Sequence, residues 1–355
     1  MMSAPRFPCS RYPLCVDLSV FFAGTGASSP SARRGLSATL VRAGGDRLLI
    51  DCGEGTQRQL VRSVGLPEID TVLLTHLHAD HWFGLPGMLK TFDLRDRQAP
   101  LEIYGPTGTR AMLDRVSAVH GKLGYPVDVE ELDVDESLRF DGYRIQTFAT
   151  RHRGATVGYV FVEDDRPGRF DADRAVELGI QPGPEFGLLQ RGETVRGVEP
   201  SQVMGEARRG RRIAFTGDTR PGDATVVAAS GADVLIHEGT FTAADRERAA
   251  ETAHSTGEQA AQVAADAGVK LLVITHVAAR VHGGELEREA QAIFPNTVVA
   301  RDFDEVELPL PDRGDPVHHT WSDRRRALAE AAAQTEIAPE QAEPATAVGP
   351  ASAGT

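Results

Sequence analysis

Thr75-His76-Leu77-His78-Ala79-Asp80-His81 follows directly after the apolar run Thr71-Val72-Leu73-Leu74. The apolar run is typical of a short buried strand, which would release the next residues at its end. Those residues carry three imidazoles and one carboxylate within six positions, so the side chains can converge on one small volume. Neutral imidazole and carboxylate suit zinc, iron or manganese. A solvated histidine cluster is the alternative, but four ligand-type side chains in the order HxHxDH favour a metal site.

Three further candidate ligands come shortly after other apolar runs. These are His152, Asp218 and His276, and Asp218 lies within Thr216-Gly217-Asp218-Thr219. The repeated context of a strand followed by a ligand favours metal binding over isolated structural histidines. From the residues alone, the histidine motif either fills one metal site or begins a second. A second ion would need these further ligands and a bridging carboxylate.

Composition restricts the class of protein. The chain has 355 residues, 41% of them hydrophobic, so it can bury a large core in one large domain or two smaller ones. Three cysteines without a CxxC pair argue against a disulfide-rich secreted protein and a thiolate metal site. Without a leader-like segment or a membrane-length apolar run, we expect a soluble cytoplasmic protein. The net charge of −13 disfavours a surface that attracts nucleic acid overall, although clustered arginines leave room for a local basic face.

The order of predicted elements indicates one main domain. Two strand-rich halves with flanking helices predict a layered αββα sandwich with the site at one edge of the strands. Spacing predicts a helix over 257–267, among others. Residues 1–15 are expected to form a loose extension, and 16–308 the domain. Residues 164–211 are rich in glycine, proline and charge, which is typical of a functional or disordered insert. The Ala, Pro and Glu content of residues 309–355 predicts a disordered tail.

Several segments together resemble the ribonuclease Z family, the tRNA 3′-processing endonucleases of the metallo-β-lactamase superfamily. The histidine motif alone would mark only the superfamily. Other segments that carry the resemblance are Phe22-Ala23-Gly24-Thr25-Gly26, Asp51-Cys52-Gly53-Glu54-Gly55-Thr56 and Thr275-His276-Val277-Ala278-Ala279-Arg280. Much more specific are three segments taken together: Pro182-Gly183-Pro184-Glu185-Phe186-Gly187, His237-Glu238-Gly239-Thr240-Phe241 and Ala253-His254-Ser255-Thr256. The resemblance covers about residues 16–308 and implies a metallo-β-lactamase sandwich with a protruding flexible arm.

The resemblance also implies a two-zinc site, for which the ligand types would also allow Mn²⁺ or Fe²⁺. One ion would be held by His76, His78 and His152, the other by Asp80, His81 and His276, with Asp218 bridging them. Asp80 would orient or deprotonate the attacking water. Glu238 and His254 would form an acid dyad that protonates the leaving oxygen. A buried structural carboxylate is the alternative for Glu238.

The implied substrate is precursor tRNA, cut 3′ of the acceptor stem to leave a 3′-hydroxyl on the tRNA and a 5′-phosphate on the trailer. The 164–211 segment would be the arm that grips the tRNA elbow, with Arg191 and Arg196 as candidate phosphate contacts. Arg280 would touch the substrate or form a salt bridge. Arg33 and Arg34 lie in a loop where many family members carry Pro-x-Lys-x-Arg-Asn; here Ala32 and Gly35 replace the lysine and the asparagine. The family often forms homodimers.

Two other functions compete with this one. One keeps the hydrolase but gives it a small phosphodiester, lactone or sulfate ester as substrate. The other is an RNA-binding protein with a degenerate site, which the presence of all seven expected metal ligands disfavours.

Overall fold

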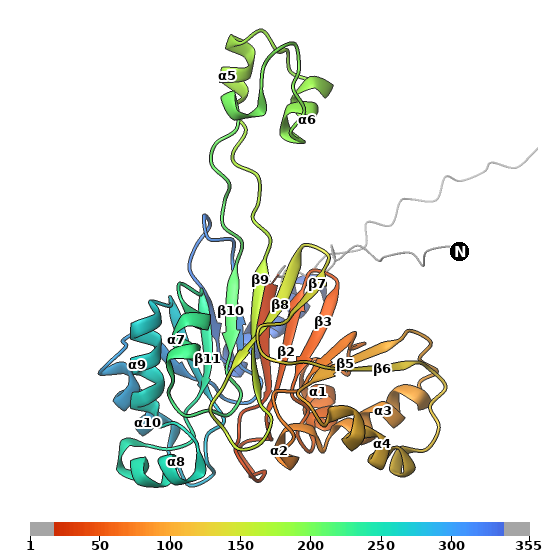
Figure 1. Cartoon of the computed structure of the whole chain (residues 1–355), viewed down its shortest axis with the longest axis vertical. Helices are drawn as coiled ribbons and strands as arrows, with labels where there is room; N and C mark the ends of the chain where they lie inside the picture. The colour runs from red at the N-terminus through yellow and green to blue at the C-terminus, as the bar shows by residue number, and fades with distance from the viewer. Residues whose placement is uncertain (1–17, 337–355) are drawn as a thin grey trace, which may run out of the picture. The chain divides into compact units, whose positions relative to one another are not determined.

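Two β-sheets form the centre of the computed structural model, which describes residues 18–336. The first sheet has the strand order β15-β14-β1-β2-β3-β4-β5-β6, and the second β13-β12-β11-β10-β9-β8-β7 (Figure 1). The strands of the first sheet are β1 (Leu18–Gly24), β2 (Ala38–Ala43), β3 (Asp46–Ile50), β4 (Thr71–Leu73), β5 (Leu101–Gly105), β6 (Val127–Glu131), β14 (Glu305–Glu307) and β15 (Val317–His319). Those of the second are β7 (Ser137–Phe140), β8 (Tyr143–Ala149), β9 (Val157–Glu163), β10 (Arg212–Phe215), β11 (Val234–Glu238), β12 (Leu271–Thr275) and β13 (Thr297–Val299).

Helices cover the outer face of each sheet. The helices on the side of the first sheet are α1 (Thr56–Ser63), α2 (Ala79–Trp82), α3 (Leu85–Leu94) and α4 (Thr109–His120). The second sheet carries α7 (Asp223–Ala229), α8 (Arg246–Thr252), α9 (Gly257–Ala267) and α10 (Gly283–Gln291). Short 3₁₀ turns occur at Pro200–Gln202 and Ala243–Asp245. The predicted α/β sandwich is therefore confirmed.

The core separates into three apolar layers, as a four-layer arrangement requires. Strand β1 illustrates why, because its side chains alternate between two faces. Val20 and Phe22 lie in the core between the sheets, together with Phe161 of the second sheet. Phe21 and Ala23 lie in the core between the first sheet and its helices. A third cluster joins the second sheet to α7, α9 and α10.

Helix α9 spans the predicted residues, and its ends have identifiable causes. Thr256 caps the amino end: its hydroxyl accepts from the Gln259 backbone, and the Gln259 side chain accepts from the Thr256 backbone. Gly268 ends the helix in the left-handed conformation, at φ 62°. Its buried face is mostly alanine and valine, which lets the helix lie close to the sheet.

The parallel strands β3–β6 and β10–β13 determine where six of the seven candidate ligands come together. Strand β8, which precedes His152, is antiparallel to β9, and β9 is antiparallel to β10, so β8 runs in the same direction as β10. Residues that follow the carboxyl ends of parallel strands emerge at one edge of a sheet. In Figure 1 the label of α2 marks this edge, and the histidine motif leads into α2 from the end of β4.

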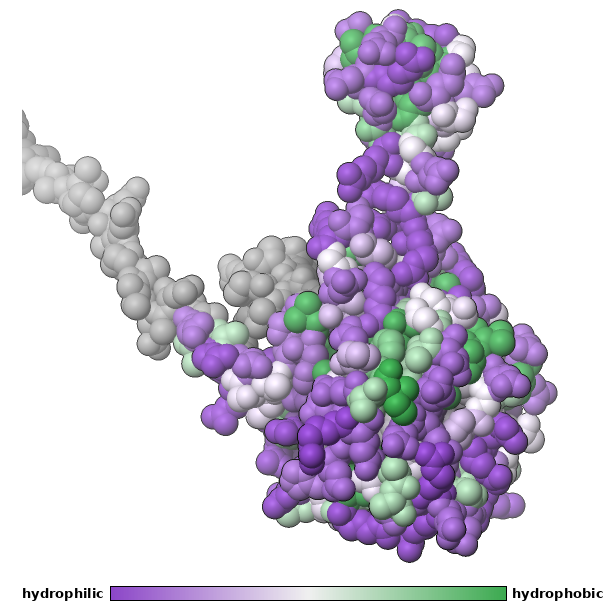
Figure 2. All heavy atoms as spheres, turned by 90° about the vertical axis from the view of Figure 1, so that its left-hand side faces the viewer, coloured by the Kyte–Doolittle hydropathy of each residue, from purple (hydrophilic) through white to green (hydrophobic). Residues whose placement is uncertain are grey.

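The 164–211 segment leaves the domain after β9 and returns at β10. Its two connecting stretches pair at Arg166–Arg208 and Phe170–Met204, and Figure 2 colours these stretches mostly hydrophilic. Gly168 permits the pairing, because a Cβ there would lie 1.9 Å from the Gly205 carbonyl oxygen. Beyond them lie α5 (Ala172–Glu177) and α6 (Pro184–Gln190). They enclose a small apolar cluster of Ala175, Ile180, Leu189, Val195, Val198 and Val203. The insert thus has an ordered tip with its own core.

The carboxyl-terminal part differs from the expectation of a disordered tail over 309–355. Strand β15 pairs antiparallel with β14, and His318 Nε2 lies 3.0 Å from Asp304 Oδ2. Helix α11 (Trp321–Glu336) follows, and the Thr320 hydroxyl both donates to the Asp323 carboxylate and accepts from the Asp323 backbone. The rest of the predicted tail, 337–355, and the predicted extension over 1–15 lie outside the described residues. Across residues 18–336, no helix is long and apolar enough to cross a membrane.

Candidate active site

The seven predicted ligands come from both sheets. His76, His78, Asp80 and His81 follow β4 of the first sheet, with the last two on α2. His152 follows β8, Asp218 follows β10 and His276 follows β12 of the second sheet. Gly217 allows Asp218 to come close to the first sheet: its φ is 60°, and a Cβ there would lie 2.6 Å from Thr75 Cβ. The structure brings all seven side chains together.

Four of these side chains form a first group. Nδ1 of His78 lies 3.1 Å from Nε2 of His76 and 3.1 Å from Nε2 of His152. Asp218 Oδ2 lies 3.6 Å from Nε2 of His76 and 3.8 Å from Nε2 of His152. Three imidazole nitrogens and one carboxylate oxygen therefore face a common point.

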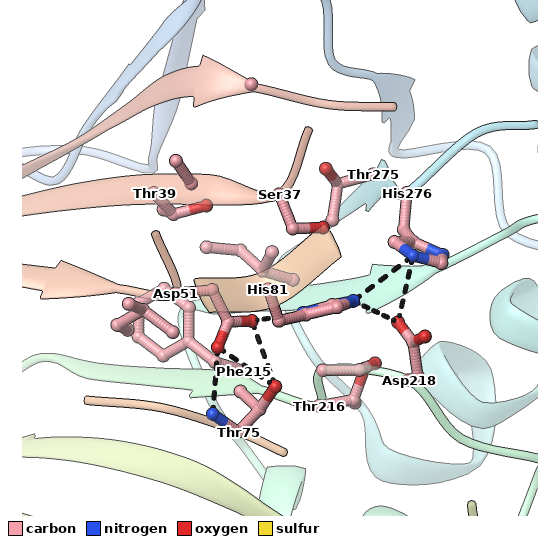
Figure 3. A pocket seen from close by; sticks show the side chains of 15 residues that line it. Ser37, Thr39, Asp51, Thr75, His81, Phe215, Thr216, Asp218, Thr275 and His276 are labelled. Carbon is pink, nitrogen blue, oxygen red and sulfur yellow. Dashed lines mark hydrogen bonds and ion pairs between the residues drawn. The ribbon is translucent and has the colours of Figure 1, made fainter. Parts of the chain in front are cut away.

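The second group lies next to the first. Nε2 of His276 is 3.3 Å from Nε2 of His81 and 3.4 Å from Asp80 Oδ2. The other oxygen of Asp218, Oδ1, lies 3.4 Å from His81 and 3.3 Å from His276 (Figure 3). The backbone N–H of Ser28 donates to Asp80 Oδ2 over 2.7 Å. Asp218 thus offers one oxygen to each group.

These donors fit divalent metal ions. Asp218 Oδ1 is buried, yet it accepts no hydrogen bond within residues 18–336. Four ligands about 2.0–2.2 Å from a tetrahedral ion are separated from one another by roughly 3.3–3.6 Å. The separations of 3.1–3.8 Å in both groups are close to that range. Cations between these side chains would explain why so many lone pairs are buried facing one another.

Burial and the neighbouring histidines shift the pKa values of the two carboxylates in opposite directions. Burial alone would raise the pKa of Asp218, but His276, His81 and His76 lower it well below its ordinary value. Burial also opposes ionisation of Asp80, yet the hydrogen bond with His276 and the charge of His81 lower its pKa. Both side chains are therefore in the ionised form that binds metal.

The pKa values of the histidines are shifted in different directions by their surroundings. Burial is the main reason that the pKa of His76 lies well below its ordinary value and that the pKa of His152 is lowered. His81 differs: burial would lower its pKa, but Asp218 and Asp51 raise it well above the ordinary value. Binding of a metal ion at His81 would consequently release a proton.

Glu238 and His254 form a close pair beside the second group. Nδ1 of His254 lies 2.8 Å from Glu238 Oε1 but 3.8 Å from Asp218 Oδ2, so Glu238 is its nearer carboxylate. Burial alone would lower the pKa of His254; Glu238, then Asp218 and Asp80, raise it to about 9. The imidazole therefore carries a proton at neutral pH, held by a fully buried carboxylate.

Three side chains to which the sequence assigned no role hold the candidate ligands in place. Asp51, at the end of β3, accepts from the Thr75 backbone over 2.8 Å and lies 2.7 Å from Nδ1 of His81 (Figure 3). The hydroxyls of Thr75 and Thr240 each lie between a carboxylate and a histidine. Asp51 shares the strand-then-ligand context of the other residues, and that signal could have identified it.

The candidate RNA-binding arginines lie in different surroundings. Arg34 turns inward and donates to the Thr25 hydroxyl and the Ala300 carbonyl, whereas Arg33 is exposed. Arg280 pairs with Asp245 over 3.0 Å and stacks over Phe241. The two arm arginines are exposed and pair with nearby glutamates, as Arg191–Glu193 and Arg196–Glu185.

Comparison with known proteins identifies the family to which this chain belongs. The family model of the metallo-β-lactamase superfamily matches residues 33–276. Ribonuclease Z of Gemmatimonas aurantiaca is 47% identical over 307 residues, which are 84% of this chain and 98% of that protein. The chain belongs to the ribonuclease Z family. Ribonuclease Z of the archaeon Archaeoglobus fulgidus is 40% identical over 82% of this chain and 98% of its own length.

Solved structures agree with this membership of the ribonuclease Z family. The short form of human tRNase Z is 30% identical and superposes with a TM-score of 0.60 over 82% of this chain and 99% of its own. The metallo-β-lactamase fold protein YhfI of Bacillus subtilis reaches a TM-score of 0.61 at 20% identity, which shows the shared fold alone.

Proposed function

We propose that this chain is a zinc-dependent endoribonuclease that removes 3′ trailers from precursor tRNA with two metal ions. Its membership of the ribonuclease Z family makes it a hydrolase that cleaves RNA. The observation that carries the two-ion site is Asp218, whose two oxygens face two separate groups of histidines. His76, His78 and His152 would hold one ion, and Asp80, His81 and His276 the other.

Zinc is the ion that this donor set favours. The ligands are imidazole and carboxylate at separations that suit a tetrahedral ion, without thiolates and with few oxygens. Mn²⁺ and Fe²⁺ accept the same ligands and remain alternatives that metal analysis would distinguish. When bound, the ions would polarise the phosphodiester and bring the pKa of water toward neutrality.

Asp80 would act on the attacking water. Its carboxylate is ionised, and the Ser28 backbone N–H fixes its position by donating to Oδ2, the oxygen that also faces His276. From there it would accept a proton as the water oxygen bonds to phosphorus. The bond between phosphorus and the 3′ oxygen of the tRNA breaks, so the new oxygen leaves with the trailer as its 5′-phosphate.

His254 would complete the reaction by protonating the departing 3′ oxygen. Glu238 keeps the imidazole protonated and engages its Nδ1, which leaves Nε2 to donate. The tRNA product then carries a 3′-hydroxyl. Protonation of an alkoxide leaving group by a positioned acid contributes about 10²–10⁴-fold to such reactions.

The arm over 164–211 would bind the tRNA at a distance from the cut. Three arginines at its base, Arg166, Arg169 and Arg208, converge on the single carboxylate of Asp312, so positive charge exceeds negative charge in this cluster. Such a surface suits a phosphate backbone and would recognise shape rather than sequence. Arg33 and Arg280 are candidate contacts near the scissile end.

Homodimerisation and a cytoplasmic location belong to the same proposal and rest on the family resemblance. Size-exclusion chromatography with light scattering tests the oligomeric state.

The deciding experiment maps the products of a precursor tRNA with a 3′ trailer, incubated with the zinc-loaded protein and with its Asp80→Ala variant. We expect one cut near the end of the acceptor stem, and a loss of rate of at least about 10³-fold in the variant, because Asp80 is both a ligand and the base. Intact RNA alongside rapid hydrolysis of a small phosphodiester would instead establish a small-molecule hydrolase.

A further inference from the structure

Glu238 contacts the site at two places. Its Oε1 lies 2.8 Å from Nδ1 of His254, and its Oε2 accepts a hydrogen bond of 2.7 Å from the hydroxyl of Thr240. The same hydroxyl lies 2.9 Å from Nδ1 of His276. Thr240 therefore connects the acid dyad to a candidate metal ligand, and the Glu238 carboxylate serves two histidines.

The direction of these hydrogen bonds follows from the number of protons. An ionised carboxylate only accepts, so the single hydroxyl proton of Thr240 goes to Glu238. The Thr240 oxygen must then accept from His276, which places a proton on Nδ1 of that ring. The lone pair of His276 is consequently on Nε2, the nitrogen that faces Asp80 and Asp218.

Asp51 and Thr75 repeat the arrangement of Glu238 and Thr240. The Thr75 hydroxyl lies 2.9 Å from Asp51 Oδ2 and 3.1 Å from Nδ1 of His76, while Asp51 also lies 2.7 Å from Nδ1 of His81. Glu238 and Asp51 are thus both buried carboxylates that contact one histidine directly and a second histidine through a threonine hydroxyl. The repetition in two unrelated stretches of chain argues against a chance contact at Thr240.

Backbone donors keep Glu238 rigid. Its Oε1 accepts from the Thr219 backbone over 2.9 Å, and its Oε2 from the Thr240 and Ser255 backbones over 3.2 and 3.0 Å. A carboxylate fixed in this way defines where the Thr240 hydroxyl can lie, and with it the angle of the His276 ring.

We propose that Thr240 is a positioning residue that holds His276 in its metal-binding orientation, so that Glu238 supports both metal binding and the acid. This inference rests on the metal part of the proposed function. It separates the two contacts that Glu238 makes: loss of His254 removes the acid and leaves the seven candidate metal ligands in place, whereas loss of the Thr240 hydroxyl weakens metal binding at the second group.

The test measures zinc affinity by competition with a chromophoric chelator, and zinc content after dialysis against buffered zinc. Thr240→Val keeps the shape of the side chain and removes the hydroxyl; we expect about 10–100-fold weaker binding of one of the two ions, the usual effect of losing such a support. Thr240→Ser keeps the hydroxyl and should restore affinity. His254→Ala should bind both ions like the original protein while losing cleavage.

A matched control accounts for the general cost of removing a buried threonine hydroxyl. Thr242 lies two residues further along, is also buried, with 6% of its surface exposed against 2% for Thr240, and makes none of the hydrogen bonds described above. Thr242→Val should leave zinc affinity unchanged, and melting of the metal-free proteins checks that each variant folds. Equal affinity of Thr240→Val and the original protein overturns the inference. If the original protein binds no zinc, the proposed function fails instead; if it binds zinc without cutting RNA, only the substrate assignment fails.

Discussion

Arg33 and Arg34 are adjacent in the chain but have different surroundings. Arg34 is partly buried and fastens the 27–35 loop to the end of β13 through the Ala300 carbonyl. Asp302 strengthens the same attachment by accepting from the Gly35 and Thr25 backbones. Arg33 is exposed, with its guanidinium available to a phosphate. One arginine therefore supports the loop, and the other is available to substrate.

This difference predicts separate effects of substitution. Arg34→Ala should lower the free energy of unfolding by about 1–3 kcal/mol, because the Ala300 carbonyl loses a charged donor. Arg33→Ala should change stability by less than about 0.5 kcal/mol and reduce the slope of log affinity for precursor tRNA against log salt by about 1. Denaturant unfolding and salt titrations, the latter in an Asp80→Ala background, measure the two quantities. Equal stability of the two variants would mean that Arg34 does not fasten the loop.

At this scale the sequence predicted which candidate ligands come together, but not the side chains that support them. His152, Asp218 and His276 were predictable because each follows an apolar strand, and the structure brings them together. The role of Thr240 depends on His276, 36 residues away, and no local pattern encodes such a contact. The inward direction of Arg34 is likewise set by a distant carbonyl.

Among the elements, the arm is the most independent. Its apolar cluster is formed by its own residues, and its two connecting stretches pair with each other. The sequence indicated an insert because glycine and proline interrupt it, yet the same interruptions scatter the apolar residues and conceal the cluster. Helix α2 was missed for a related reason: a four-residue helix within the histidine motif is too short to show a period.

Replacing residues 170–204 by a short Gly-Ser linker should separate RNA binding from chemistry. The ends of the deletion already pair, as Phe170 and Met204, so a few residues can connect them. We expect kcat/KM for precursor tRNA to fall on the order of 100-fold, or about 2.7 kcal/mol of transition-state binding, with hydrolysis of a small chromogenic phosphodiester retained. Unchanged tRNA cleavage would rule out the tip over 170–204 as a binding element, since Arg166, Arg169 and Arg208 remain in this variant.

A second variant guards against damage from the deletion itself. Arg191→Ala combined with Arg196→Ala leaves the arm in place and removes two exposed charges. If phosphates contact these side chains, the pair of substitutions weakens tRNA binding most at low salt and leaves small-substrate hydrolysis unaltered.

Over the whole molecule, the site connects the two sheets. Each ligand group takes side chains from the end of β4 in the first sheet and from the second sheet, where Asp218 contributes to both groups. Without cations, the imidazoles of the site and the buried Asp218 carboxylate face one another directly where the two sheets meet. Bound ions would therefore stabilise the packing of one sheet on the other, and metal binding would be coupled to global stability.

Thermal unfolding at increasing free zinc tests this coupling. A site at which free zinc is 100 times the dissociation constant adds about 2.7 kcal/mol, which in a chain of this size raises Tm by roughly 4 °C. Asp218→Asn should abolish most of the zinc-dependent rise, because it removes the charge that both groups share. Asp312→Asn, an aspartate at the base of the arm, should keep the full rise even if its starting Tm is lower. A Tm that is independent of zinc in the original protein would show that zinc does not bind the folded chain in preference to the unfolded chain, and the coupling would be wrong.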